Sequence, residues 1–94
     1  MDHELIVFAE FVSASGLTRE EIVELVESGL FEPAGAAIDE WAFPESALFL
    51  ARIAARLRED FELAPASLAL LLAYRERMLE LERRVRQLEC RLPR

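Results

Sequence analysis

The stretch "GLTREEIVELVESGLFEP", residues 16–33, decides the fold because it contains the signals for both ends of a short helix. Thr18 is placed to act as the N-cap, and Glu21, three residues later, completes the pattern of a capping box. Gly29 favours a left-handed residue at the C-terminal end, and Pro33 prevents the helix from resuming. The stretch therefore predicts a helix that begins after Thr18 and ends before Gly29.

This predicted helix has one apolar face and one acidic face. Ile22, Leu25 and Val26 recur at the spacing i, i+3, i+4, which predicts that they face a core. A glycine turn followed by such a helix is typical of the second helix of a helix-turn-helix motif, where a DNA reader exposes Arg, Lys, Asn or Gln. Carboxylates in those positions repel the phosphate backbone and favour a cationic protein partner over DNA. The acidic side chains of this helix are Glu20, Glu21, Glu24 and Glu27.

Negative charge is concentrated in the first half of the 94-residue chain. The net charge is −7, and residues 1–40 hold ten of the 18 acidic side chains against one of the 11 basic ones, Arg19. Asp39 and Glu40, in the segment after the acidic helix, belong to this anionic half. Such a surface attracts cationic partners and discourages nucleic acids and anionic membranes.

Length and composition predict one small cytoplasmic domain. Hydrophobic residues make up 53% of the chain, enough for a modest core. The apolar run 5–8 predicts a short strand and is far too short for a signal sequence or a membrane span, so we expect no membrane partner. Cys90 is the single cysteine, which excludes a disulfide framework and suits the cytoplasm.

The sequence around the acidic helix predicts a mainly α, winged helix-turn-helix head over residues 1–63. Residues 8–14 predict a first helix, and Pro44 is expected at the first position of a third helix, over residues 46–61, where its missing N–H costs nothing. A small β-hairpin wing is expected at residues 34–43, with the apolar anchors Ile38, Trp41 and Phe43. The inward stripe expected on the third helix is Phe49, Leu50, Ile53, Leu57 and Phe61.

Residues 64–94 predict a long C-terminal helix that dimerises as a coiled coil. Pro65 begins this helix, which continues without a break to about residue 92. From residue 71 onward the apolar side chains follow heptad spacing, so a single chain presents an apolar seam that a second copy covers. The predicted dimerisation residues are Leu71, Met78, Val85 and Leu92 at position a, and Tyr74, Leu81 and Leu88 at position d.

No combination of residues indicates catalysis, a cofactor or a metal. His3 is the only histidine, and no second ligand stands at metal-binding spacing from it. The serines lack a histidine to activate them, and no glycine-rich loop is present to hold a phosphate. We therefore expect a non-enzymatic protein.

The order of these features resembles a known family. "FVSASGLTREEIVELVESGLFEP", a short hairpin, "WAFPESAL" and a long terminal helix resemble the MerR-like winged helix-turn-helix layout, and within it the chaperone-modulator family of CbpM type. The resemblance spans almost the whole chain. It is carried by Glu10-Phe11, Gly16-Leu17, the Glu-rich second helix, Gly29 before Glu32-Pro33, and Trp41-x-Phe43.

The resemblance implies a protein partner. Modulators of this type bind the J-domain of a DnaJ-like co-chaperone of the CbpA type and block its work with a DnaK-type chaperone. J-domains carry a basic helix, and the acidic first half of this chain is its physical complement. The resemblance does not identify the contacting acids, and the expected partner-binding residues are Glu20, Glu21, Glu24, Glu27, Asp39 and Glu40.

Two other functions and both coil polarities stay open from the sequence. The chain also fits a MerR-like transcriptional regulator that reads DNA with its third helix and wing, or a coiled-coil adaptor with an inert head. MerR dimers use antiparallel coils, which here set Arg against Arg. In a parallel coil, by contrast, Arg77 and Arg84 at position g meet Glu82 and Glu89 at position e of the partner.

Overall fold

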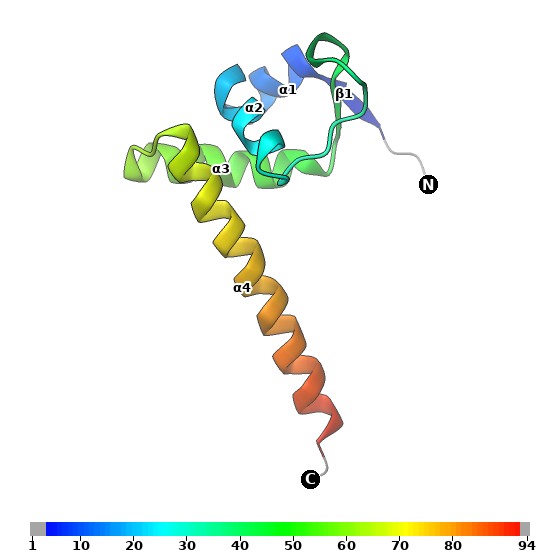
Figure 1. Ribbon diagram of the computed structural model, residues 1–94, viewed down its shortest axis with the longest axis vertical. Coiled ribbons are helices and arrows are strands. Elements are labelled where there is room, and N and C mark those ends of the chain that lie inside the picture. Colours follow the sequence, from blue (N-terminus) through cyan, green and yellow to red (C-terminus); the bar gives the residue numbers. More distant parts are fainter. Residues whose placement is uncertain (1–3, 93–94) are drawn as a thin grey trace.

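The computed structural model describes residues 4–92, so His3 lies outside the described residues. A compact head of short elements stands at one end of a long helix that projects from it (Figure 1). This arrangement confirms the predicted mainly α, winged helix-turn-helix fold with a long C-terminal helix. In chain order, the elements are β1 (Leu5–Val7), α1 (Phe8–Ser15), α2 (Arg19–Glu27), the 3-10 turn η1 (Ile38–Glu40), β2 (Ala42–Pro44), α3 (Ala47–Phe61) and α4 (Pro65–Arg91).

Helix α2 has the two ends that its sequence predicts. The Glu21 N–H donates to the Thr18 hydroxyl at 3.1 Å, and the Thr18 N–H donates to Oε1 of Glu21 at 2.8 Å, so the capping box is complete. At the other end, Gly29 has a φ of 88°, and its N–H donates to the carbonyl of Val26 at 3.0 Å. The left-handed glycine therefore ends the helix, as expected.

The turn between α1 and α2 is stabilised from within. Gly16 adopts a φ of 84°, and its N–H donates to the carbonyl of Val12 at 3.3 Å. The Leu17 N–H donates to the hydroxyl of Ser15 at 3.1 Å, which satisfies a buried donor. Leu17 itself is buried, so this turn fixes α2 against the core.

The strands and the wing differ from a simple hairpin. β1 and β2 pair antiparallel, with Ile6 opposite Phe43. Ala34 and Ala42 form one isolated bridge, in which each N–H donates to the other's carbonyl at 2.8 and 3.0 Å. The expected hairpin is therefore a loop closed by a single bridge, and its strand β2 takes β1 as its partner.

The tip of this wing is tight and faces solvent. A Cβ atom on Gly35 would lie 2.5 Å from the carbonyl oxygen of Glu40, so the loop requires glycine at this position. Ile38 is 40% exposed because η1 holds it at the tip, and the prediction that it anchors the wing is wrong.

A cluster of aromatic rings forms the core of the head. The rings of Phe11 and Phe43 stack with their centroids 4.3 Å apart, and Phe31 packs edge-on against both. Phe8 and Trp41 extend the cluster, with 5.5 Å between their centroids. These rings join α1, β2 and the segment after α2 into one core.

Helix α3 begins at Ala47, later than predicted, and the face that it buries is not the predicted one. Pro44 is the last residue of β2, a strand end at which a missing N–H is tolerated. The buried residues of α3 are Ala51 and Ala54, because small side chains let α1 approach closely. Phe49 and Phe61 consequently point outward, with 73% and 64% of their surface exposed, so their placement on an inward stripe is wrong. The other members of that stripe are half-buried: Leu50, Ile53 and Leu57.

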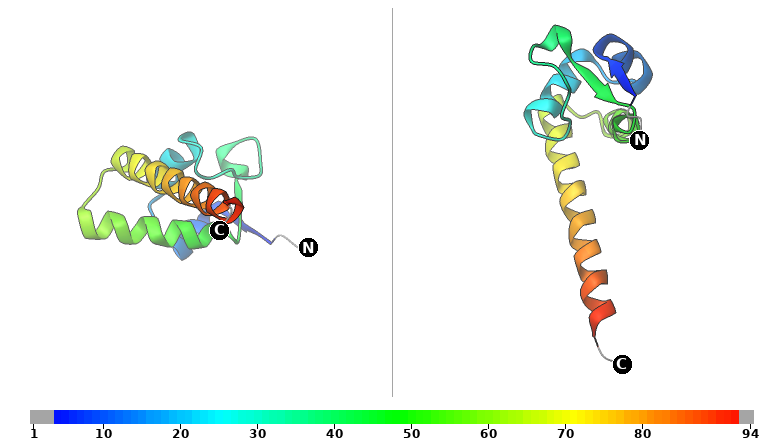
Figure 2. Two further views of the ribbon diagram at one scale, coloured as in Figure 1. Left: turned by 90° about the horizontal axis from the view of Figure 1, so that it is seen from below. Right: turned by 90° about the vertical axis from the view of Figure 1, so that its right-hand side faces the viewer.

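Helix α4 starts inside the head and leaves it. Leu68 and Leu72 are fully buried, and the first turns of α4 contact α2 and α3. The rest of α4 extends away from the head, as the right view of Figure 2 shows, and the longest dimension of the molecule is 54 Å. Within residues 4–92, no helix is long and apolar enough to cross a membrane. The division into residues 1–63 and 64–94 stays a prediction.

Candidate partner-binding surface

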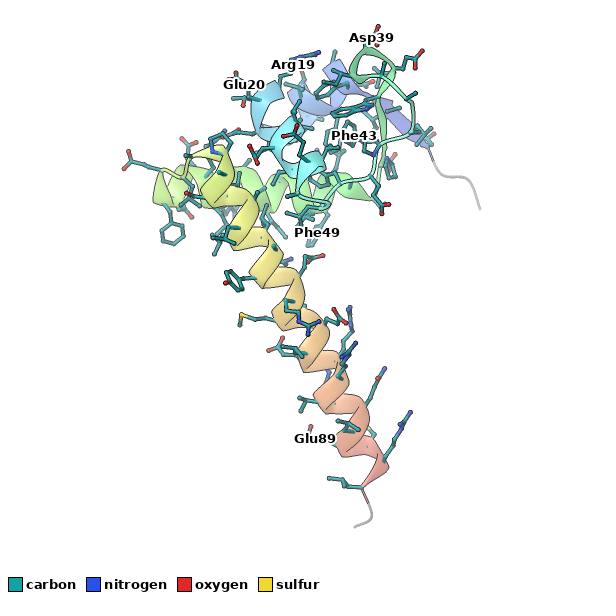
Figure 3. The ribbon with its side chains drawn as sticks, viewed as in Figure 1. Arg19, Glu20, Asp39, Phe43, Phe49 and Glu89 are labelled. Atoms are coloured by element: carbon teal, nitrogen blue, oxygen red, sulfur yellow. The ribbon has the colours of Figure 1, made fainter. Side chains whose placement is uncertain are left out.

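The predicted acidic residues lie on two elements of the head, α2 and η1. Glu20 and Glu27 are exposed near the two ends of α2, and Glu24 is half-buried between them. Asp39 and Glu40 are exposed in η1. Figure 3 shows Glu20 and Asp39 in the part of the head farthest from the C-terminal end of α4. These five residues are called the acidic surface below.

No cation of residues 4–92 forms an ion pair with the acidic surface. Oε1 of Glu40 accepts a long hydrogen bond, 3.4 Å, from the N–H of Ala37. Arg19, the single base of the first 40 residues, lies over the ring of Phe8, with its guanidinium carbon 4.7 Å from the ring centroid. The negative charge of this surface is therefore available to a partner.

Glu21 is not part of that surface, contrary to prediction. Its exposed fraction is 5%, and its carboxylate pairs with the guanidinium of Arg58 on α3. The same carboxylate accepts the capping bond from the N–H of Thr18. Both interactions hold the carboxylate in a fixed position inside the head. Glu21 therefore has a structural role, because it links α2 to α3.

Two arginines of α3 are also engaged within the head. The second guanidinium nitrogen of Arg58 donates to the carbonyl of Gly16 at 3.0 Å, and Nε of Arg52 donates to the carbonyl of Ala14 at 3.3 Å. Both carbonyls belong to the C-terminal end of α1, where the helix dipole favours positive charge. The sequence did not indicate these bonds, because 38 residues separate Arg52 from Ala14 and 42 separate Arg58 from Gly16.

The predicted dimerisation residues all lie on the projecting part of the molecule. Their exposed fractions range from 38% for Leu71 to 65% for Leu92. A run of exposed apolar side chains this long on one helix is unusual unless something covers it. The exposed seam, as we name it below, consists of Leu71, Tyr74, Met78, Leu81, Val85, Leu88 and Leu92.

Phe49 marks a second exposed apolar site that the sequence pattern misplaced. Figure 3 shows it on α3, on the side of the head from which α4 projects. The signal that distinguishes the buried face of α3 is the pair of small residues, Ala51 and Ala54, which mark the close approach to α1.

The described residues offer no cluster for a metal. Within residues 4–92, no group of three or more His, Cys, Asp or Glu side chains is arranged to hold an ion. Cys90 is exposed near the end of α4.

Comparison with known proteins identifies the family. Residues 6–90 match the family described as MerR HTH family regulatory protein. The chain is 37% identical over 78 residues to a chaperone modulatory protein CbpM of Pseudomonas putida (strain W619), covering 83% of this chain and 77% of that protein. It is 38% identical over 80 residues to a CbpM of Coxiella burnetii (strain Dugway 5J108-111), covering 85% and 76%. The chain belongs to the CbpM family of chaperone modulatory proteins, within the MerR-like helix-turn-helix group.

Proposed function

We propose that this CbpM-family chain modulates a chaperone system by binding the J-domain of a DnaJ- or CbpA-like co-chaperone. The acidic surface contacts the basic helix of the J-domain and blocks its engagement of a DnaK-type chaperone. The protein acts by occupancy and catalyses no reaction. The observation that carries this proposal is a set of exposed carboxylates on α2 and η1 without ion pairs among residues 4–92.

The proposed recognition is mainly electrostatic. Exposed charges of opposite sign steer two proteins together, which raises the association rate and makes it sensitive to salt. Salt screens such charges over about 8 Å at physiological ionic strength. We therefore expect J-domain binding to weaken as salt rises.

A DNA-binding transcriptional regulator is the second candidate, favoured by the match to the MerR HTH family. Its reader would be α3 with the wing, since α2 is acidic. Two of the three arginines of α3, Arg52 and Arg58, bond carbonyls of the α1 end, which leaves Arg56 as the one that makes no such bond among the described residues. Because α3 has only this one arginine that is not bonded to the end of α1, a protein partner is favoured over DNA.

One titration separates the two candidates. The chain is added at physiological salt to a labelled J-domain of a CbpA-type co-chaperone, and separately to labelled duplex DNA of mixed sequence. The proposal expects saturable binding to the J-domain and a loss of its stimulation of the DnaK-type ATPase. Saturable nanomolar binding to DNA without binding to the J-domain would overturn it in favour of the regulator.

We also propose that the chain is a homodimer, with residues 64–94 as its dimerisation segment and residues 1–63 as its head. The exposed seam supports this proposal, since burying each of its large side chains is worth about 1.5–3 kcal/mol before the cost of association. A dimer covers the seam along the projecting part of α4, whereas the acidic residues lie on α2 and η1 of the head, of which Figure 3 labels Glu20 and Asp39.

A further inference from the structure

Positive charge gathers near the C-terminal end of α4. Residues 83–91 contain four of the 11 basic side chains and one acid, Glu89, although the net charge of the chain is −7. Figure 3 labels Glu89 near this end of α4 and Glu20 on the head. An open hollow on this stretch is lined by five side chains, which we call the basic face below: Arg83, Arg86, Gln87, Cys90 and Arg91.

The arginines of α4 divide into two groups according to their partners. Arg75 pairs with Glu76 at 3.2 Å, and Arg77 and Arg84 share the carboxylate of Glu80, at 3.6 and 3.0 Å. The three arginines of the basic face, by contrast, form no ion pair with any of residues 4–92. Their charge is therefore available to a partner.

The basic face lies on the side of α4 opposite the exposed seam. Successive residues of a helix are about 100° apart, so Arg83, two positions from both Leu81 and Val85, points about 160° away from each of them. In the heptad, Arg83 and Cys90 occupy position f and Arg86 occupies position b, which point away from a coiled-coil partner. A second copy on the seam therefore leaves the basic face open.

The negative charge of the head does not cancel the basic face. The last buried residue of α4 is Leu72, and at a rise of about 1.5 Å per residue Arg83 stands about 16 Å farther along the helix axis. Salt screens exposed charges over about 8 Å at physiological ionic strength, half of that separation. The head and the end of α4 therefore attract partners of opposite charge.

We propose that the basic face binds an acidic segment of a partner protein, a short run of Asp and Glu side chains. Guanidinium groups form bidentate, charge-assisted hydrogen bonds with carboxylates. Arg83 and Arg91 are eight residues apart, or about 12 Å along the helix, and four extended residues of a peptide cover the same length at about 3.3 Å each. This contact is independent of the proposed J-domain contact, because it uses a different surface.

Nucleic acids and membranes fit this face less well. Affinity for a nucleic acid grows with the number of phosphates that cations neutralise, and three arginines neutralise few. Glu82 and Glu89 stand four residues before and three residues after Arg86, so a phosphate backbone that continues along α4 meets carboxylates, whereas a short acidic segment ends before them. An anionic membrane would take up the apolar side of α4, which the proposed dimer covers.

Fluorescence anisotropy with a fluorescein-labelled decaglutamate peptide tests the inference. The full chain should bind this peptide saturably at low salt, and binding should weaken as salt rises. Arg83→Gln with Arg86→Gln removes two charges of the basic face and keeps good helix formers, so the dissociation constant should rise about fivefold or more. Arg56→Glu makes the same change in net charge at an exposed residue of α3, and this control should bind the peptide as the wild type does.

Two kinds of result would overturn the inference. One is a wild-type chain that does not bind decaglutamate saturably at low salt, or that binds it no more tightly than the Arg83→Gln, Arg86→Gln variant does. The other is tighter binding of an oligothymidylate with the same number of charges, or of vesicles that contain phosphatidylserine, which would favour a nucleic acid or a membrane. The J-domain is not a component of this assay, so a failure of the proposed function leaves its outcome unaffected.

Discussion

At the scale of single residues, the Glu21–Arg58 contact shows how one side chain changes role between sequence and structure. Local signals identify Glu21 correctly as the N3 residue of a capping box. They do not reveal that Arg58, 37 residues later, closes over the same carboxylate and buries it. The acidic surface therefore has one charge fewer than the sequence suggests, and the helix-turn-helix has one internal connection more.

Removing Arg58 should destabilise the head. Arg58→Ala leaves the buried Glu21 carboxylate without its cation and the Gly16 carbonyl without its donor, so the free energy of unfolding should fall by about 2 kcal/mol. This loss of stability is smaller than that expected on breaking a fully buried ion pair, because the Arg58 side chain is 23% exposed. Urea denaturation followed by circular dichroism measures the change. Arg56→Ala, an exposed neighbour on the same helix, is the control and should stay within about 0.5 kcal/mol of wild type.

Trp41 reports on the aromatic core. It is half-buried and packs against Phe8 and Phe43, so Trp41→Ala should lower the free energy of unfolding by about 2–3 kcal/mol, somewhat less than a fully buried ring. As the sole tryptophan it also gives an intrinsic signal, and its emission should be blue-shifted relative to the unfolded chain. An emission maximum that stays the same on unfolding would contradict its packing in the core.

At the scale of elements, the sequence predicts correctly the helix ends, which depend on residues only a few positions away. The ends of α2 follow from Thr18 and Gly29, and the start of α4 follows from Pro65, because caps and prolines act within a few residues. The face of α3 does not follow from periodicity. Phe49 and Phe61 fit an apolar stripe, but the close approach of α1 selects the face with the small residues.

The pairing of β2 with β1 also could not be predicted from local sequence signals, because it depends on residues that are far apart in the chain. A hairpin needs only neighbouring residues, whereas β2 pairs with β1 across more than 30 residues of chain. Of the candidate site, the sequence located the exposed acids of α2 and η1 and the exposed seam of α4. It could not identify the bonds of Arg52 and Arg58, which depend on how α3 lies against α1.

The dimer prediction belongs to α4 as an element. Leu81→Glu with Leu88→Glu places charges in the centre of the exposed seam, so the variant should be monomeric at tens of micromolar in light scattering while the head keeps its helical circular dichroism. Phe49→Glu is the control, because it places a charge at an exposed apolar side chain on α3, outside the seam, and should leave the dimer intact. A wild-type monomer at the same concentration would contradict the role of the seam.

At the scale of the whole molecule, charge and apolar surface are separated along the long axis. The acidic surface lies on the head, and the exposed seam runs along α4 away from it (Figures 1 and 3). Membership in the CbpM family fits this division, since a modulator needs one surface for its target and can use another for assembly. Each surface can therefore be altered while the other is left intact.

The central claim, that the acidic surface binds a J-domain, is tested most directly by surface-plasmon kinetics with a charge-reversed α2. Glu20→Lys with Glu27→Lys reverses two exposed charges without touching the capping box. Asp60→Lys with Glu62→Lys makes the same change in net charge at the C-terminal end of α3 and serves as the control. The α2 variant should bind the J-domain on the order of tenfold more weakly, about 1.4 kcal/mol, mostly through slower association, and the control should resemble wild type. Equal association rates for wild type and the α2 variant, at low and at physiological salt, would contradict the claim.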